Sequence, residues 1–92
     1  MANKIIKFEK ESEILKALGH PVRLKMVFGL IDNNECNVNE IVEGLKLPQS
    51  TISQHLSILK SRGIIVSRKE GVKTCYKVVN EKVLEIVEVL KK

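Results

Sequence analysis

The chain has 92 residues, a net charge of +5 and 43% hydrophobic residues, which suits one small domain with an aliphatic core. No apolar run approaches the roughly 18 residues of a membrane span, and the N-terminus leads into no signal-peptide core. We therefore expect a cytoplasmic protein. The acids are scattered, and no Gly-rich phosphate loop or nucleophile beside a base is present, which argues against an enzyme.

Two amphipathic helices are predicted in the first third of the chain. The first, over residues 8–18, spaces its apolar side chains at helical intervals: Phe8, Ile14, Leu15 and Leu18. Gly19-His20-Pro21 ends it, and proline suits the first turn of the next helix. Residues 22–31 repeat apolar side chains at i, i+3, i+4 and i+7, which predicts a buried stripe of Leu24, Val27, Phe28 and Ile31.

A short third helix and a longer fourth helix follow, separated by a tight turn at Pro48. Asn37 or Asn39 is the candidate N-cap of the third helix, which closes near Leu45. The fourth helix runs over residues 49–62 and is stopped by Gly63. Its buried arc holds Ile52, Leu56 and Leu59. The opposite arc spans roughly 140° at 100° per residue and holds Gln49, Ser50, Ser53, Gln54, Ser57, Lys60 and Ser61.

The outward arc of the fourth helix carries no acid, although solvated helix faces usually mix Glu with Lys. Its small side chains have many hydrogen-bonding groups, and its C-terminal end is basic. Such a face suits the DNA major groove, where base edges offer donors and acceptors and phosphates repel carboxylates. We therefore expect the DNA contacts of this helix to be Gln49, Ser50, Thr51, Ser53, Gln54, Ser57 and Lys60.

A basic hairpin is predicted after the fourth helix. Two β-rich runs, residues 64–69 and 72–79, are joined around Glu70-Gly71. Residues 46–77 hold seven bases against the single acid Glu70, a net +6, whereas the other residues hold nine bases against ten acids. This segregation is typical of a nucleic-acid binder. Arg68, Lys69 and Lys73 are the expected phosphate contacts of the hairpin.

The predicted fold is mainly α with a small β-hairpin, an α+β winged helix-turn-helix in the order ααα(α)ββα. The single domain, 1–92, divides into a helix-turn-helix at 38–62, a wing at 64–79, and dimerisation helices at 1–18 and 81–92. The last helix carries apolar side chains around more than half of its circumference, more than packing on its own domain requires. The N-terminal segment has further apolar side chains, Ile5, Ile6 and Phe8, and such surplus apolar surface usually marks an interface. A two-fold dimer would hold its recognition helices about 34 Å apart, matching a pseudo-palindromic operator in double-stranded DNA.

Two motifs resemble the ArsR/SmtB family of winged-helix repressors. One is Leu18-Gly19-His20-Pro21-Val22-Arg23-Leu24, and the other is Leu47-Pro48-Gln49-Ser50-Thr51-Ile52-Ser53-Gln54-His55-Leu56, followed by Leu59 and Gly63-Ile64-Ile65. The resemblance covers about residues 12–79. It implies a homodimeric repressor that covers a promoter and is released by an inducer. The DNA-reading positions of the family match Gln49, Ser50, Ser53 and Gln54.

The familiar metal sites of this family do not carry over. The Cys-Val-Cys type motif that opens the third helix in many members is replaced by Asn37-Val38-Asn39. The last helix, 81–92, has no His and no Asp, so we expect no metal and no cofactor. His20 is interpreted as a helix-start residue, and His55 as a packing or phosphate-contacting residue.

Cys36 and Cys75 leave two interpretations open: small hydrophobic residues of the core, or redox-active thiols. The segment before the third helix often pairs with the return strand of a wing, which would bring the two cysteines close together. Strand alternation, however, turns Tyr76 and Val78 inward and Cys75 outward, so an intramolecular disulfide is expected to be strained. Modification of a reactive Cys75 beside the wing lysines would then weaken DNA binding.

Two other functions remain open at this point. A winged helix can serve only in protein–protein contact or bind RNA, and a DNA binder can be architectural, without sequence preference. The basic wing and the neutral outward face favour DNA over a protein partner. The Gln49-Ser50 and Ser53-Gln54 pairs favour base readout over an architectural role.

Overall fold

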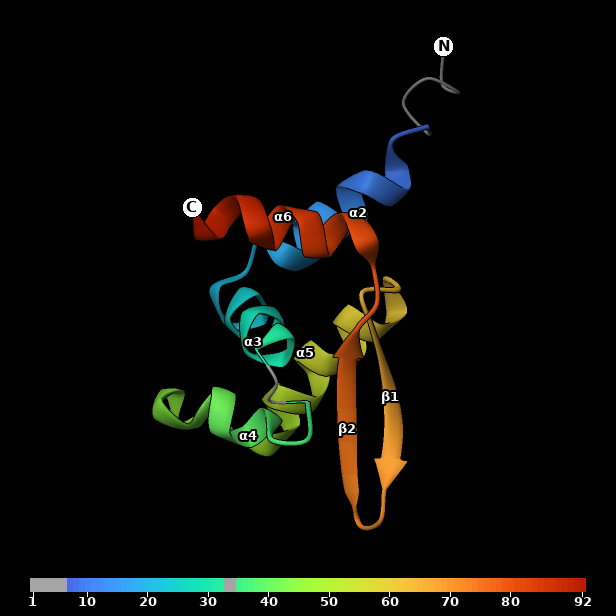
Figure 1. Ribbon diagram of the computed structural model, residues 1–92. Helices are drawn as coiled ribbons and strands as arrows, with labels where there is room; N and C mark the ends of the chain where they lie inside the picture. Colours follow the sequence, from blue (N-terminus) through green and yellow to red (C-terminus); the bar gives the residue numbers. More distant parts are fainter. Residues whose placement is uncertain (1–6, 33–34) are drawn as a thin grey trace.

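The computed structural model describes residues 7–32 and 35–92 and has the predicted winged helix-turn-helix architecture. Figure 1 shows α6 lying across α2 at one end of the molecule, with the hairpin pointing away toward the other end. The elements in chain order are α2 (Glu9–Leu18), α3 (Pro21–Ile31), α4 (Val38–Ile41), the 3₁₀ turn η1 (Glu43–Leu45), α5 (Gln49–Ser61), β1 (Ile65–Glu70), β2 (Lys73–Val78) and α6 (Glu81–Lys91).

The helix ends follow the local sequence signals. His20 begins α3 as predicted: its Nδ1 accepts a hydrogen bond from the backbone N–H of Val22 at 3.2 Å. Asn80 caps α6 in the same way, with its side-chain oxygen accepting from Val83 N at 3.2 Å. Gly63 follows α5 with a φ of +71°, a backbone conformation that glycine adopts without steric cost.

The third helix is less regular than the sequence predicts. Asn37 stands at its N-cap, but the side chain makes no capping hydrogen bond. The α-helical part, α4, has only 4 residues and passes into the 3₁₀ turn η1. Lys46 then closes the segment in the left-handed region, with a φ of 52°. This tight closure directs the chain through Pro48 into α5.

The core lies between the helices and the base of the hairpin. Its buried side chains are almost all aliphatic: Ala17, Leu18, Met26, Val27, Leu30, Val42, Ile52, Leu56, Leu59, Ile64, Ile65, Val78, Val83 and Val87. The predicted arc of α5 is confirmed, because Ile52, Leu56 and Leu59 are all buried. Along α2, Leu18 is buried and Ile14 is partly buried, whereas Phe8 and Leu15 are exposed.

The predicted stripe of α3 is only partly right. Val27 is fully buried as predicted, and Met26 and Leu30 are buried with it, whereas the predicted Leu24, Phe28 and Ile31 pack against the core but are only partly buried. The buried arc is therefore turned by about one residue, or about 100°, around the helix axis. The cause is tertiary: α3 packs against α2, α4, α5 and β2, so several of its sides meet other elements.

Gly29 allows α3 and α4 to approach closely. A Cβ at this position would lie 2.7 Å from Cγ1 of Ile41, too close for an ordinary contact. The glycine thereby sets the spacing between α3 and the first helix of the helix-turn-helix.

The hairpin is antiparallel and joined by a two-residue turn. Its register pairs Ile65 with Val78 at the base and Glu70 with Lys73 at the tip. Gly71 opens the turn with a φ of 64°, as a type II′ turn requires at its first central position. At the base, Val79 N donates to Ile64 O at 3.0 Å, and Ile64 N donates to Leu59 O of α5 at 3.0 Å, which fixes the hairpin to the end of that helix.

The prediction that Cys75 points outward is wrong. Cys75 is fully buried and forms a disulfide with Cys36, the bond that strand alternation argued against. The physical reason is a third segment on the free edge of β2, where Tyr76 N donates to Glu35 O at 2.8 Å. This segment brings Cys36 onto Cys75, which is buried although Lys73 and Lys77 on the same face of β2 remain exposed. Val78 is buried as predicted, and Tyr76 is only partly buried.

Within the described part of the chain, no helix combines the length and the apolar character that crossing a membrane would require.

Candidate nucleic-acid interface

The outward face of α5 is exposed as predicted. Its exposed side chains are Gln49, Ser50, Ser53, Gln54, Ser57 and Lys60, on the side opposite the buried aliphatic stripe. Thr51 lies at the edge of this face and is partly buried. The face holds hydrogen-bond donors and acceptors of several kinds and one positive charge at its C-terminal end. It can therefore meet both base edges and phosphates.

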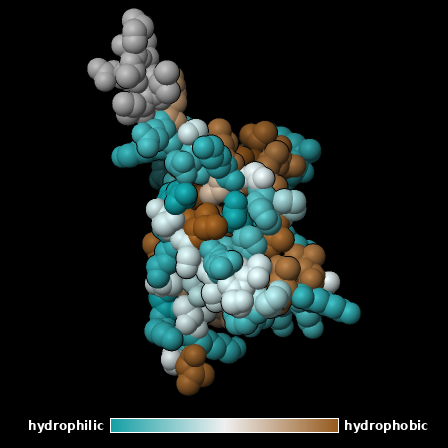
Figure 2. All heavy atoms as spheres, turned by 180° about the vertical axis from the view of Figure 1, so that it is seen from behind, coloured by the Kyte–Doolittle hydropathy of each residue, from teal (hydrophilic) through white to brown (hydrophobic). Residues whose placement is uncertain are grey.

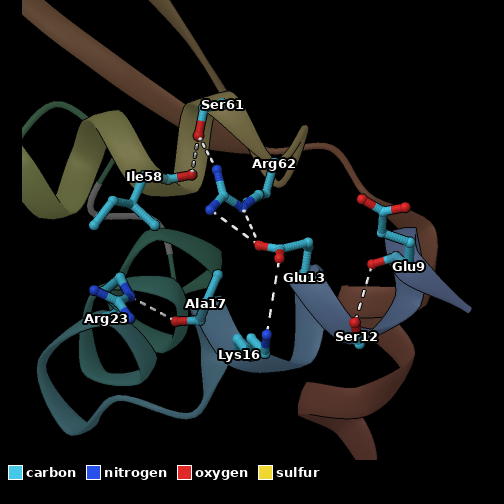
Figure 3. A network of polar contacts seen from close by, with 9 residues as sticks. All are labelled: Glu9, Ser12, Glu13, Lys16, Ala17, Arg23, Ile58, Ser61 and Arg62. Carbon is cyan, nitrogen blue, oxygen red and sulfur yellow. Dashed lines mark hydrogen bonds and ion pairs between the residues drawn. The ribbon is translucent and has the colours of Figure 1, made fainter. Parts of the chain in front are cut away.

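The C-terminal end of α5 is anchored to α2 rather than free. Both Nε and Nη2 of Arg62 lie 3.0 Å from Oε2 of Glu13, and Figure 3 shows this contact bridging the two helices. The hydroxyl of Ser61 donates to Ile58 O and accepts from Arg62 Nη1, each at 2.9 Å. Ser61 and Arg62 thus position the helix. Arg62 is also exposed, but its guanidinium is engaged by Glu13, whereas Lys60 is exposed on the outward face.

A groove runs between α5 and the hairpin. One hollow, of about 420 Å³, is lined by Gln49 and Ser53 of α5, by Lys73 and Tyr76 of β2, and by Cys36. A second, of about 220 Å³, continues past Ser57 and Lys60 beside Ser67 and Thr74. Tertiary structure thus brings the polar face of α5 and part of the basic hairpin to the two walls of one groove.

The three basic residues expected to contact phosphate differ in their surroundings. Lys69 and Lys73 are exposed on the hairpin. Arg68 Nη1 instead donates to Glu35 Oε1 at 3.0 Å, and its Nε lies 3.4 Å from Glu70 Oε2. The hydrogen bond that Arg68 donates to Glu35 raises the pKa of the Arg68 guanidinium. Arg68 keeps its charge, but two carboxylates compete with phosphate for it.

A cluster of three basic side chains lies behind α5. Arg23 donates from Nε to Ala17 O at 2.7 Å and from Nη1 to His55 Nδ1 at 3.2 Å. The rings of His20 and His55 lie 4.7 Å apart. Burial, followed by the nearby His20 and Arg23, lowers the pKa of His55. A neutral His55 accepts this hydrogen bond from Arg23 and so links α5 to the start of α3. Its role is therefore to position α5.

Glu35 is the residue at this interface that sequence reasoning missed. The available signal was its place beside Cys36, in the segment expected to pair with the return strand. Its side-chain contact with Arg68 joins positions 33 residues apart and has no local signature.

Among the described residues, no group of three or more His, Cys, Asp or Glu side chains is placed to hold a metal ion.

A second surface lies at the opposite end of the molecule. Hydrophobic side chains of α2 and α6 remain exposed there: Phe8 60%, Leu15 58%, Leu84 36%, Val89 65% and Leu90 54%. Figure 2 shows hydrophobic atoms gathered at the α6 end, at the upper right of that view. We call these five residues the terminal patch.

An acid-free helix face opposite a basic hairpin, both held by a helix-turn-helix, defines a winged helix-turn-helix DNA-binding protein. The family model described as bacterial regulatory protein, arsR family, matches residues 20–67. The chain belongs to this arsR family and is a DNA-binding transcriptional regulator rather than an enzyme.

Individual relatives span nearly the whole chain. An uncharacterized HTH-type transcriptional regulator of Methanocaldococcus jannaschii is 45% identical over 84 residues, which is 91% of this chain and 94% of the relative. The transcriptional repressor PagR of Bacillus anthracis is 43% identical over 83 residues, 89% of this chain and 82% of the relative. The crystal structure of PagR superposes with a TM-score of 0.76 at 37% identity, covering 94% of this chain and 98% of that one.

Reduced HlyU from Vibrio cholerae has the same fold, with a TM-score of 0.81 at 32% identity over 98% of this chain and 94% of that one. The homodimeric winged helix-turn-helix DNA-binding domain Mb0332 from Mycobacterium bovis has a TM-score of 0.78 at 25% identity. It covers 99% of this chain and 83% of that chain.

Proposed function

We propose that this protein is a cytoplasmic homodimeric repressor that binds a pseudo-palindromic operator in promoter DNA and is released by an inducer. The observation that carries sequence-specific reading is the composition of the exposed α5 face. Gln49, Ser50, Ser53 and Gln54 offer donors and acceptors at successive turns, with no acid among them. Phosphate contacts alone need only positive charge, so such a row suits the reading of base edges.

The remaining interface residues take supporting roles in this proposal. Thr51, Ser57 and Lys60 flank the reading row, and Lys69 and Lys73 contact phosphates beside the groove. Arg68 also contacts a phosphate once the phosphate displaces Glu35 and Glu70 from its guanidinium. These phosphate contacts add affinity without sequence information, and each steepens the dependence of binding on salt.

Dimerisation is proposed through the terminal patch. α6 packs on its own domain through Val83 and Val87, which leaves Val89 and Leu90 exposed on its other side. Exposed apolar groups that cluster on one surface commonly mark a protein interface. The homodimeric relative from Mycobacterium bovis supports a homodimer. Within the proposed dimerisation segments, 1–18 and 81–92, Ile5 and Ile6 lie outside the described residues.

Fluorescence anisotropy tests the DNA-binding proposal. The reduced protein is titrated onto a labelled duplex from just upstream of its own gene, with excess random-sequence duplex as competitor. We expect binding that survives the competitor. Binding that the competitor removes would leave an architectural or distant-operator role, and no binding at all would favour the protein-interaction role.

A pair of variants separates base reading from phosphate contact. Gln54→Ala should cost about 1–3 kcal/mol on the upstream duplex and little on random DNA, because it removes a hydrogen-bonding group from the base-reading row. Lys69→Gln should weaken binding to both duplexes and reduce the salt slope by about 1 for each phosphate that is no longer neutralised. Equal effects of Gln54→Ala on both duplexes would contradict its assigned role.

A further inference from the structure

A short segment before α4 is attached to the wing in three ways. Cys36 is joined to Cys75 by a disulfide that links positions 39 residues apart, with Cα atoms 4.1 Å apart. The neighbouring Glu35 accepts a hydrogen bond from Tyr76 N through its backbone oxygen at 2.8 Å. The carboxylate of Glu35 accepts from Arg68 Nη1 at 3.0 Å. The disulfide is the only covalent one of these three attachments.

The two sulfur-bearing residues differ in accessibility. Cys36 is partly buried and lines the hollow shared with Gln49, Ser53 and Lys73. Cys75 is fully buried beneath it. A small oxidant or reductant entering from the groove would therefore meet Cys36 first. The bond sits beside the proposed DNA-reading surface, so a change in its state acts at the binding site itself.

We propose that Cys36 and Cys75 form a reversible redox pair, and that closing the disulfide lowers the affinity of the wing for DNA. This inference rests on the proposed DNA-binding function and adds its regulation. The closed bond holds the segment on β2 and keeps the carboxylate of Glu35 beside Arg68. A tethered carboxylate both occupies the guanidinium and repels an approaching phosphate.

Reduction removes the covalent attachment and leaves one backbone hydrogen bond and one solvent-exposed ion pair. Exposed ion pairs are weak in water, so a DNA phosphate can replace Glu35 on Arg68. The cytoplasmic setting of the proposed function agrees with this, because disulfides there are usually transient and catalytic or redox-sensing.

The chemistry balances with a hydroperoxide as oxidant. The Cys36 thiolate attacks one peroxide oxygen, the O–O bond breaks, and a sulfenic acid forms while the departing oxygen leaves as water or an alcohol. The Cys75 thiolate then attacks the Cys36 sulfur and displaces hydroxide, which leaves as water. Two electrons pass from the two thiols to the peroxide. An external dithiol reverses the reaction by thiol–disulfide exchange and itself becomes the disulfide.

The expected size of the effect follows from counterion release. One phosphate contact changes the slope of log K against log salt by about 0.9, which is about fivefold in affinity at 0.15 M salt relative to 1 M. A dimer has two wings. Full recovery of Arg68 in both would therefore steepen the slope by about 1.8 and tighten binding about 25-fold at 0.15 M salt relative to 1 M.

The test compares oxidised and reduced protein on a random-sequence duplex of about 30 base pairs, since the phosphate contribution is independent of sequence. One sample is oxidised with hydrogen peroxide and the other is reduced with dithiothreitol, and free-thiol titration verifies each state. Anisotropy titrations across a salt series give affinity and slope. We expect tighter binding and a steeper slope for the reduced protein.

Three variants separate the switch from damage to the fold. Cys36→Ser changes a partly buried residue and should hold the protein in the tight-binding state, insensitive to peroxide. Glu35→Gln keeps the disulfide but should remove most of the difference between the two states. Glu43→Gln makes the same charge change on η1, away from the wing, and should leave the difference in DNA affinity between oxidised and reduced protein unchanged. Circular dichroism checks the folding of all three variants.

The outcomes are distinguishable. Equal affinities for verified oxidised and reduced protein would overturn the switch while leaving the proposed DNA binding intact. Tighter binding by the oxidised form, or an unchanged redox response in Glu35→Gln, would overturn the Glu35 mechanism. No binding to the random or the upstream duplex in either state would remove the proposed function and the switch together.

Discussion

Leu90→Ala is predicted to weaken the proposed dimer about 30-fold. Leu90 is 54% exposed in the single chain, so roughly half of its side chain is available for burial by a partner. Full burial of a leucine contributes about 1.5–3 kcal/mol, so truncating the available half costs about 1 kcal/mol in each protomer. A two-fold interface contains the residue twice, which makes about 2 kcal/mol in total. At 1.4 kcal/mol per tenfold, the dissociation constant rises about 30-fold.

Sedimentation equilibrium over a dilution series measures that constant. Val72→Ala is the matched control, because Val72 is 99% exposed in the turn between Glu70 and Lys73. Figure 1 shows this tip of the hairpin at the end of the molecule away from α6. This substitution removes a similar amount of exposed apolar surface and should leave dimerisation unchanged. A monomeric parent at micromolar concentration, or equal dissociation constants for both variants, would refute the assignment of the terminal patch as the dimer interface.

Two further predictions concern stability. Because the pKa of His55 is lowered from its ordinary 6.5, the folded protein binds fewer protons than the unfolded chain as the pH falls. This contribution is fully present above about pH 6.5 and is lost as the pH falls toward the folded pKa. The thermal midpoint should therefore drop more between pH 7.5 and 5 in the parent than in His55→Gln, and parallel curves would contradict this. Gly29→Ala should destabilise the fold by about 1 kcal/mol in urea unfolding, since overpacking against Ile41 exceeds the gain in helix propensity. Gly44→Ala, with no atom within 4 Å of the added carbon, should cost nothing, and equal destabilisation by both variants would contradict the packing explanation.

Local patterns were sufficient for the elements and for the outward face of α5. Pro21, Gly63 and the turn at Gly71 are short-range signals, and the helix and hairpin ends lie within a few residues of their predicted positions. The same holds for α5, whose buried and exposed arcs follow from a period of 3.6 residues within one helix. These features depend on neighbours in sequence, and so the sequence predicts them.

The buried side of α3 and the surroundings of Arg68 could not be predicted in this way. Which arc of α3 is buried depends on how many elements pack around it, and periodicity alone does not count them. Arg68 reads as a free cation in the sequence, yet Glu35 reaches it from another segment. A contact between distant segments leaves no pattern in either one.

By itself, the sequence determined a winged helix-turn-helix with a polar, acid-free reading helix and a basic hairpin, because helical and strand periods and turn residues act locally. Only the tertiary structure decided whether Cys75 is buried and which residue it bonds to. Alternation along β2 assigns Cys75 to the outer face, and a strand in isolation would expose it. A third segment lies on the edge of β2 and places Cys36 against Cys75, which is buried and disulfide-bonded while its neighbours Lys73 and Lys77 stay exposed. Burial is a property of everything that packs on a surface, and that is known only when all the segments are in place.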